Sequence, residues 1–377
     1  MNAGTVQNAK QLIAQGQLGG AAQMLQLHLA SSPGDRESRQ LLAQVYLYSG
    51  KSNEAIAQYY ELLRMFPNDA DIRFRLRELH RKAVPAWHYL MLNDSDRNQK
   101  YRAAVEKLVT PDSIVLEIGT GSGILAMIAA RAGARHVYTC EQSLPLANAA
   151  RQVIERNGLT KKITVLNKWS TELNVGVDIP EPADVLLAEI FGTSLVNEGM
   201  AKFYNDARVR LLKPSAICIP QSAKIIGKLI QSESIRKQVR VDEVEGFDVR
   251  LLNALYDTPT IITSLNSVNH TSLSAAFDLF EYDFSRDISL QASVLSEITA
   301  TASGTCHAIA FWFNLLLAQD IEHNIQLNSS PESTGTHWQQ EIQVFDRPFS
   351  IEEGKRYSLK VEHYGDTILM SGINQLP

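Results

Sequence analysis

The stretch VLEIGTGSGILAMIAARAG, residues 115–133, constrains the fold most strongly. An apolar run is broken by glycines and followed by residues that favour a helix, so the pattern predicts a strand, a tight loop and a helix. That order is typical of a doubly wound α/β sheet, where ligands bind beyond the carboxyl ends of the strands. We therefore expect Gly119, Thr120, Gly121 and Gly123 to form a loop against a ligand.

The residues around this loop favour a nucleoside without phosphate. The loop lacks both the lysine of a P-loop and the G-x-G-x-x-G spacing of the dinucleotide fingerprint. Glu117 ends the first strand, where a carboxylate repels a pyrophosphate and attracts a cation. Glu141 follows the next apolar run, where such folds bind a ribose diol. S-adenosylmethionine suits both acids, because it carries an ammonium and a sulfonium; the alternative is a glycine-rich turn of another α/β domain.

Composition narrows the class of protein. The chain has 377 residues, 45% apolar and 20% charged, which predicts two or three globular domains. The lack of a long apolar stretch or a signal-peptide pattern predicts a soluble, intracellular, cytoplasmic protein without a membrane partner. A net charge of −5 argues against direct nucleic-acid binding. Single, widely spaced cysteines predict reduced core thiols and no metal site.

Residues 1–83 predict a helical unit built from repeats. Four positions recur 34 residues later: Gly16, Ala21, Leu25 and Pro33 as Gly50, Ala55, Tyr59 and Pro67. This period resembles tetratricopeptide repeats. About two repeats are too few for independent stability, so the unit should pack on its neighbour. It serves either as a docking surface for a protein partner or as a helical packing extension.

Two further domains are predicted after the repeats. Residues 84–110 predict a helical lead-in, and alternating strands and helices then predict a cofactor domain over 84–220, with a helix at 206–216. Short alternating runs predict an antiparallel β domain over 221–377, interrupted by a helical insertion at about 230–256. Four apolar residues on the insertion lack an obvious partner and predict an interface: Ile235, Val239, Val241 and Val244.

The order of parts and several motifs resemble the protein arginine methyltransferase family. The motifs are MLND, VLEIGTGSG, the acid after the second strand, EIFGTSLVNE, HAIAFWF and THWQQ. The resemblance covers residues 84–377 and implies a Rossmann-like S-adenosylmethionine methyltransferase domain, then an antiparallel β-barrel with a helical dimerisation arm. With its repeats, the chain is similar to the branch that carries N-terminal tetratricopeptide repeats. It implies a homodimer that methylates arginine in protein substrates.

The resemblance also implies the cofactor contacts. Arg97 is expected to bind the carboxylate of S-adenosylmethionine, while the loop glycines let its methionine part approach the backbone. Glu141 is expected to hold the ribose, and His88 falls at a cofactor-lid position. Either Ser170 or Glu172 is expected near the adenine.

Glu189 and Glu198 lie nine residues apart, on a loop that leaves a strand end, and resemble the double-glutamate loop of the family. The methyl donor and the guanidinium acceptor are both cations that must meet within about 3–3.5 Å. Two carboxylates can hold the guanidinium and offset this repulsion. Because arginine has a pKa above about 12, the proton should leave with or after the methyl transfer. The alternative is a pair of solvated surface glutamates.

The THW segment, residues 336–338, resembles the family's loop that closes the substrate pocket. His337 is expected to pair with Asp94 and to take the departing proton. A structural His337–Asp94 bond between two domains is the alternative. Trp338 is expected to wall the arginine channel, and Met91 to lie beside the guanidinium.

Three functions compete at this stage: a protein arginine methyltransferase, a methyltransferase for a small guanidine or amine, and a non-catalytic scaffold. The intact set of charged residues argues against the scaffold, and the repeats argue against a small substrate. The product type stays open. THW resembles asymmetric-dimethylating members, whereas WHYLMLNDSDRN resembles the monomethylating and symmetric-dimethylating branches.

Overall fold

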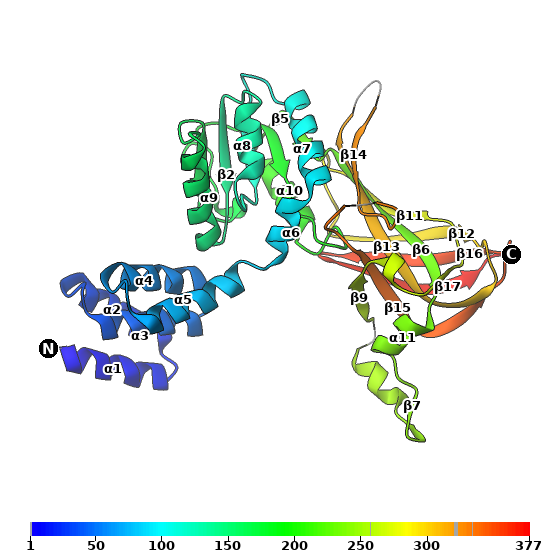
Figure 1. Cartoon of the computed structure of the whole chain (residues 1–377), viewed down its shortest axis with the longest axis horizontal. Helices are drawn as coiled ribbons and strands as arrows, with labels where there is room; N and C mark the ends of the chain where they lie inside the picture. Colours follow the sequence, from blue (N-terminus) through cyan, green and yellow to red (C-terminus); the bar gives the residue numbers. More distant parts are fainter. Residues whose placement is uncertain (1, 257, 320–322, 334) are drawn as a thin grey trace.

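The computed structural model describes residues 2–256, 258–319, 323–333 and 335–377. A helical unit, a parallel sheet with helices and a set of antiparallel strands follow one another along the chain (Figure 1). In the view of Figure 1 the helical unit lies below the parallel-sheet part, and the antiparallel strands lie to the right of that part. The domain boundaries 83/84 and 220/221 stay predictions.

The helical unit repeats with the predicted period. Its helices are α1 (Asn2–Ala14), α2 (Leu18–Ser31), α3 (Arg36–Tyr48), α4 (Ser52–Met65) and α5 (Ala70–Ala83). α1, α3 and α5 start 34 residues apart, as do α2 and α4. Asp35 and Asp69, also one period apart, cap α3 and α5 by accepting backbone N–H bonds. Ala21 and Ala55 are fully buried, and the tetratricopeptide assignment itself stays a prediction.

The cofactor part begins with the predicted helical lead-in, α6 (Trp87–Asn93) and α7 (Ser95–Leu108). Its parallel sheet has the order β3-β2-β1-β4-β5 and contains β1 (Ile114–Ile118), β2 (His136–Cys140), β3 (Ile163–Leu166), β4 (Ala183–Ala188) and β5 (Leu212–Ile219). The intervening helices are α8 (Ile124–Arg131), α9 (Leu144–Arg156), the short η1 (Ser170–Glu172) and α10 (Met200–Arg210). The strand order reverses between β1 and β4, so a crevice opens at their carboxyl ends.

The predicted helix at 206–216 is wrong over its second half. α10 ends at Arg210, and β5 begins at Leu212. Pro214 cannot donate to a helix or to a central strand, but an edge strand tolerates it. β5 is the edge strand next to β4, and Pro214 is exposed where their pairing is irregular.

The last part contains two antiparallel sheets. The larger contains β6 (Ser222–Gln231), β9 (Thr260–Thr263), β10 (Thr271–Ser272), β11 (Phe277–Asp283), β13 (Gly304–Ala318), β14 (Ile325–Asn328) and β15 (Gln340–Ile351). The smaller contains β12 (Gln291–Thr299), β16 (Arg356–Tyr364) and β17 (Thr367–Gln375). Both bury apolar side chains in one core that continues into the parallel sheet. The predicted barrel thus consists of two sheets that no strand ladder joins within the described residues.

The insertion between β6 and β9 is only partly the predicted helix. α11 (Glu233–Val239) is followed by a hairpin of β7 (Glu243–Val244) and β8 (Phe247–Asp248) and by the 3-10 helix η2 (Arg250–Leu255). Glu245 and Gly246 have φ of 52° and 81°, which suits the two-residue turn of a hairpin. Ile235 is buried, and Val239 packs with it on the larger sheet, so their predicted exposure is wrong.

The cysteines lie in the core. Cys140, Cys218 and Cys306 are free and buried. Burial raises the pKa of each thiol to about 12, which keeps them protonated at neutral pH. Among the described residues, no helix has both the length and the hydropathy needed to cross a membrane.

Candidate active site

A cleft of about 1560 Å³ lies beyond the carboxyl ends of β1 and β4. It reaches from the end of the helical unit to the antiparallel strand β9. The residues predicted for the site line this cleft, except Asp94 and Gly123, which support it from behind. Residues that are far apart in the sequence therefore meet at one place.

The glycine loop takes its shape from left-handed backbone. Gly119 and Gly123 have φ of 87° and 82°, a region in which a side chain is strained. A Cβ at Gly119 would lie 3.1 Å from Ile190, and one at Gly123 would lie 3.2 Å from Ile154. Close packing at these two positions therefore requires glycine. The loop lies next to Glu141.

Glu141 is held by backbone amides at both carboxylate oxygens. Oε2 accepts from Gly121 N at 3.0 Å, and Oε1 accepts from Ser143 N at 2.8 Å. Burial raises the pKa of Glu141, although these backbone hydrogen bonds oppose the shift. Each oxygen keeps a further lone pair, which suits a ribose diol.

Glu117 presents a polar atom without a partner. Its Oε2 accepts from the hydroxyl of Thr139, which also contacts Thr120 Oγ1 at 2.6 Å. Its Oε1 is buried and has no hydrogen-bond partner among the described residues. Burial raises the pKa of Glu117 to about 8. A cationic ligand group would satisfy this oxygen and favour the ionised carboxylate.

Ser170 is the second such group on the cleft wall. It is buried, and its hydroxyl has no partner in the described part of the chain. Glu172 is exposed, and its carboxylate accepts from Trp169 N at 3.1 Å, closing the turn of η1. The rings of Trp169 and Phe203 stack at 5.8 Å and 9° beside them. An unpaired hydroxyl beside exposed aromatic surface fits a nucleobase, so the residues present fit S-adenosylmethionine.

Arg97 is buried and joins the cofactor pocket to the double-glutamate loop. Its Nε donates to Glu189 Oε2 at 3.1 Å, and its Nη2 also binds that oxygen. Its Nη1 donates to Asn98 Oδ1 at 2.7 Å. The side chains of Arg97 and Glu189 are 2% and 6% exposed, so the pair lies in a weakly screened environment.

The two glutamates of the loop differ in environment. Glu189 directly follows β4 and is paired with Arg97, whereas Glu198 has no hydrogen bond or ion pair among the described residues. Glu198 is accessible from the open cleft, but the surrounding walls remove much of its hydration. This desolvation and the charge of Glu189 raise the pKa of Glu198 to about 7. It is therefore unlike a freely solvated surface glutamate.

Trp338 and Met91 close the cleft near these glutamates. Trp338 is buried, its Nε1 donates to Phe191 O at 2.9 Å, and its ring meets Phe313 edge-on at 5.2 Å. Met91 on α6 is buried and lines the same cleft. The antiparallel part thus anchors the backbone of the double-glutamate loop through Trp338.

Asp94 connects the lead-in to the THW segment. Its Oδ1 accepts from Arg97 N at 2.9 Å and caps α7, while Oδ2 accepts from His337 N at 3.0 Å and lies 2.9 Å from His337 Nδ1. Burial raises the pKa of Asp94, but hydrogen bonds from His337 and Arg97 more than offset it, so the pKa is lowered. Because an ionised carboxylate only accepts, Nδ1 is the donor. The predicted contact is present, and its role stays a prediction.

His88 lies on the cleft wall at the start of α6. Its Nδ1 donates to Pro85 O at 3.0 Å, and its ring stacks on Trp87 at 3.9 Å and 14°. The contact to Pro85 holds the ring in the cleft that Glu141 also lines. A lid role for His88 stays a prediction.

Comparison with known proteins identifies the family. Residues 221–367 match the family described as the arginine methyltransferase oligomerization subdomain, and residues 102–219 match that of ribosomal protein L11 methyltransferase. The arginine N(omega)-methyltransferase of Streptomyces achromogenes subsp. streptozoticus is 37% identical over 313 residues, which cover 82% of this chain and 85% of that protein. The chain belongs to the arginine methyltransferase family.

A further relative and two solved structures are also similar to this chain. Protein arginine N-methyltransferase 7 of Danio rerio is 30% identical over 76% of this chain, which spans only 46% of that relative. The PRMT1 enzyme–prozyme heterotetrameric complex of Trypanosoma brucei with AdoHcy has a TM-score of 0.70, at 24% identity over 79% of this chain and 95% of that one. Protein arginine methyltransferase 10 of Arabidopsis thaliana has a TM-score of 0.60, at 24% identity over 72% and 86%. These structures show the fold.

The predicted family, fold class and enzyme class are thereby confirmed for this arginine methyltransferase. Sequence reasoning missed Trp169 and Phe203, although a tryptophan just after the third strand was a usable signal. It also missed the bond of Arg97 to Glu189, for which the sequence offers no signal, because the two residues lie 92 positions apart.

Proposed function

We propose that this arginine methyltransferase modifies arginine side chains in protein substrates. The observation that carries the proposal is one continuous cleft with the nucleoside-type acids at one end and Glu189 and Glu198 at the other. Its volume of about 1560 Å³ exceeds the roughly 300–1,000 Å³ typical of small-ligand sites. It therefore has room for a polypeptide segment beside the cofactor.

The cofactor side is assigned from the polar groups at this end of the cleft, of which Glu117 Oε1 and Ser170 Oγ have no partner among the described residues. Glu141 is proposed to hold the ribose, Glu117 the ammonium group, Arg97 the carboxylate and Ser170 the adenine. When bound, S-adenosylmethionine supplies an electrophilic methyl group. The loop glycines let the backbone pack closely against the bound cofactor, and His88 covers the pocket as a lid. Both are proposed to exclude water from the methyl group.

The two loop glutamates have different proposed roles toward the substrate guanidinium. Glu189 is held in place by its buried ion pair with Arg97, and it orients the substrate. Glu198 has no such partner, so the arriving guanidinium becomes its counter-ion. With Nδ1 donating to Asp94, His337 offers Nε2 as the acceptor of the departing proton.

The pH dependence should follow Glu198. Because its pKa is raised to about 7, the free enzyme carries a neutral Glu198 below that pH and attracts a guanidinium less strongly. We expect kcat/KM for an arginine peptide to rise with pH through about 7. Initial rates at saturating S-adenosylmethionine between about pH 5 and pH 9, which span about two pH units on either side of this pKa, measure this. If Glu198 causes this rise of kcat/KM with pH, His337→Asn should show the same rise. Loss of the pH dependence in that variant would assign it to His337.

Free arginine is the second candidate substrate. The Streptomyces achromogenes relative carries the name arginine N(omega)-methyltransferase, without reference to a protein. Labelled S-adenosylmethionine should be supplied with either free L-arginine or an arginine peptide, and kcat/KM compared. The proposal expects the peptide to be preferred. A preference for free arginine would overturn the protein substrate and leave arginine methylation standing.

The insertion between β6 and β9 is proposed to dock on a second copy, making a homodimer. It projects away from the sheets (Figure 1), and its exposed apolar residues are Val244, Phe247, Leu251, Leu252, Leu255 and Tyr256. Such a patch is typical of an interface, and the matched oligomerization subdomain supports it.

We also propose that the protein is located in the cytoplasm. The helical unit is proposed to bind a protein partner.

A double substitution tests the interface. Leu251→Asp with Leu255→Asp should convert a dimer to a monomer, because both side chains are at least 84% exposed in one chain and would place charges in the contact. Light scattering measures the mass. Leu295→Asp, at a position on β12 that is 71% exposed, serves as the control. A wild-type enzyme that is monomeric and active at assay concentration would contradict the homodimer.

A further inference from the structure

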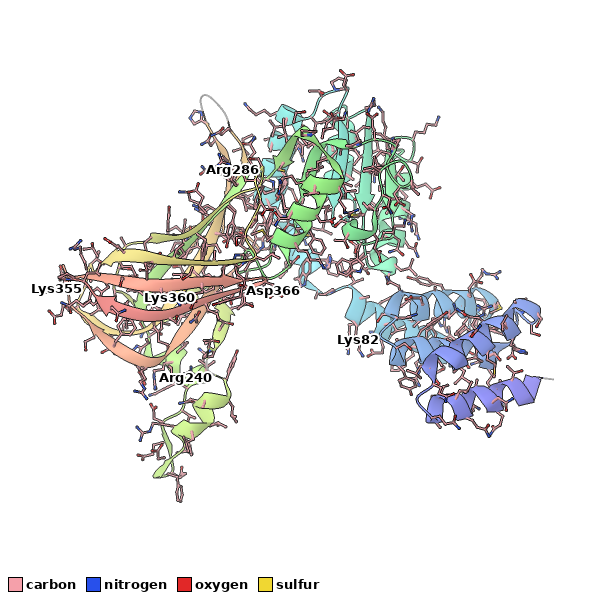
Figure 2. All side chains as sticks on the ribbon, turned by 180° about the vertical axis from the view of Figure 1, so that it is seen from behind. Lys82, Arg240, Arg286, Lys355, Lys360 and Asp366 are labelled. Carbon is pink, nitrogen blue, oxygen red and sulfur yellow. The ribbon has the colours of Figure 1, made fainter. Side chains whose placement is uncertain are left out.

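The helical unit contacts the cofactor domain at the segment Gln142–Leu144, directly after Glu141, and at α9. α4 and α9 lie next to each other there, and Lys82, near the end of α5, lies where the helical unit joins the rest of the chain (Figure 2). Leu144 packs against the apolar cluster between α3, α4 and α5. Residues of the helical unit, among them Asn53 and Ala83, line the cleft itself.

Asn53 binds this segment with both ends of its side-chain amide. Nδ2 donates to Gln142 O at 2.5 Å, and Oδ1 accepts from Leu144 N at 3.0 Å. The two bonds fall on either side of Ser143. No other hydrogen bond of the Asn53 side chain occurs among the described residues, so its amide serves the cofactor domain and not the helical unit.

Ser143 orients the carboxylate of Glu141. Its backbone N–H donates to Glu141 Oε1 at 2.8 Å, one of the two bonds that hold this carboxylate. Ser143 precedes α9, yet its own side chain does not cap the helix. Asn53 supplies the missing acceptor to the first amide of α9, and Asn167 Nδ2 holds the other side of the segment at Glu141 O, 2.8 Å, and Gln142 O, 3.1 Å.

We infer that Asn53 is a positioning residue for Glu141, so that the helical unit forms part of the cofactor site and does more than pack or dock partners. By fixing the peptide groups before and after Ser143, Asn53 fixes the direction of the Ser143 N–H and thereby of the carboxylate. Without it, Glu141 must be ordered when the nucleoside binds, which weakens binding. The inference rests on the ribose-binding role of Glu141 in the proposed function.

Asn53→Ala in the full chain tests this inference. The affinity for S-adenosylhomocysteine, measured by calorimetry, should fall about tenfold, as expected for the loss of two hydrogen bonds that order the site. KM for S-adenosylmethionine should rise accordingly, while kcat at saturation stays near wild type, because Asn53 does not touch the reacting groups. Asn8→Ala, an exposed asparagine on α1, is the matched control and should change neither value.

Hydrogen exchange separates positioning from general destabilisation. In Asn53→Ala the backbone amides of Ser143, Leu144, Leu146 and Ala147 should exchange faster, while those of α2 and α3 stay protected. Loss of protection throughout the helical unit with unchanged affinity for S-adenosylhomocysteine would overturn the inference, because the Asn53 contact would then only stabilise the packing of the helical unit.

Glu141→Ala, alone and combined with Asn53→Ala, completes the test. If Asn53 acts through Glu141, the double variant binds S-adenosylhomocysteine no more weakly than Glu141→Ala. Weak binding by Glu141→Ala with normal binding by Asn53→Ala would overturn this inference and leave the proposed function intact. Normal binding by Glu141→Ala would instead reject the ribose role itself, and the inference with it.

Discussion

Glu198→Gln is expected to lower turnover about 100- to 1000-fold, the cost of removing one preorganised charge from the place where a cation must be held. The change is nearly isosteric, and Glu198 has no hydrogen-bond or ion-pair partner among the described residues, so the fold should not respond to it. Its expected partner is the substrate guanidinium and not the nucleoside. Calorimetric affinity for S-adenosylhomocysteine should therefore stay close to wild type while the methylation rate collapses.

Glu106→Gln provides the control for that experiment. Glu106 is exposed on α7 and lies outside the residues that line the cleft. This variant should retain the wild-type rate. A Glu198→Gln enzyme with near wild-type turnover would reject the double-glutamate mechanism.

Arg97→Met is expected to have the largest effect on stability. Arg97 and Glu189 are almost fully buried against each other, and removing one partner leaves an uncompensated charge, which costs about 3–5 kcal/mol in comparable pairs. Urea unfolding measures this free energy. The same variant should bind S-adenosylhomocysteine weakly, because the carboxylate contact is lost as well.

The double variant Arg97→Met, Glu189→Met distinguishes the two effects. Replacing both charges by apolar side chains should restore much of the stability, because no buried charge remains unpaired, while activity stays lost. Arg102→Met, an exposed position on the same helix, is the control. Wild-type stability and cofactor affinity in Arg97→Met would show that the buried pair supports neither.

Features set by neighbouring residues could be predicted well from the sequence. The run at 115–133 specifies strand, turn and helix because glycine alone fits the left-handed backbone at Gly119 and Gly123. The 34-residue period could be read because each repeat makes the same local helix contacts, as Ala21 and Ala55 do. The acids at the carboxyl ends of β1, β2 and β4 could be placed together because parallel strands end at one edge of a sheet.

Features that depend on distant contacts could not be predicted. The helix expected at 206–216 gave way to β5 because an edge position beside β4 was available to Pro214. Ile235 looked unpartnered in the sequence, yet the larger antiparallel sheet buries it completely. Val244 is exposed as predicted, but the insertion exposes further apolar residues, such as Phe247 on the hairpin and Leu251 on η2, because these elements extend away from the core.

By itself, the sequence determined the family, the nucleoside-type loop and the identity of the acids, since motifs and spacings record local backbone demands and the chemistry of individual side chains. Only the tertiary structure decided how those acids are held. Arg97 neutralises Glu189 across 92 positions, and Asn53 braces the segment after Glu141 across 89 and 91 positions. Such pairings depend on the packing of whole elements, because a charge or an amide recognises whatever the fold brings within about 3 Å, however distant in the chain.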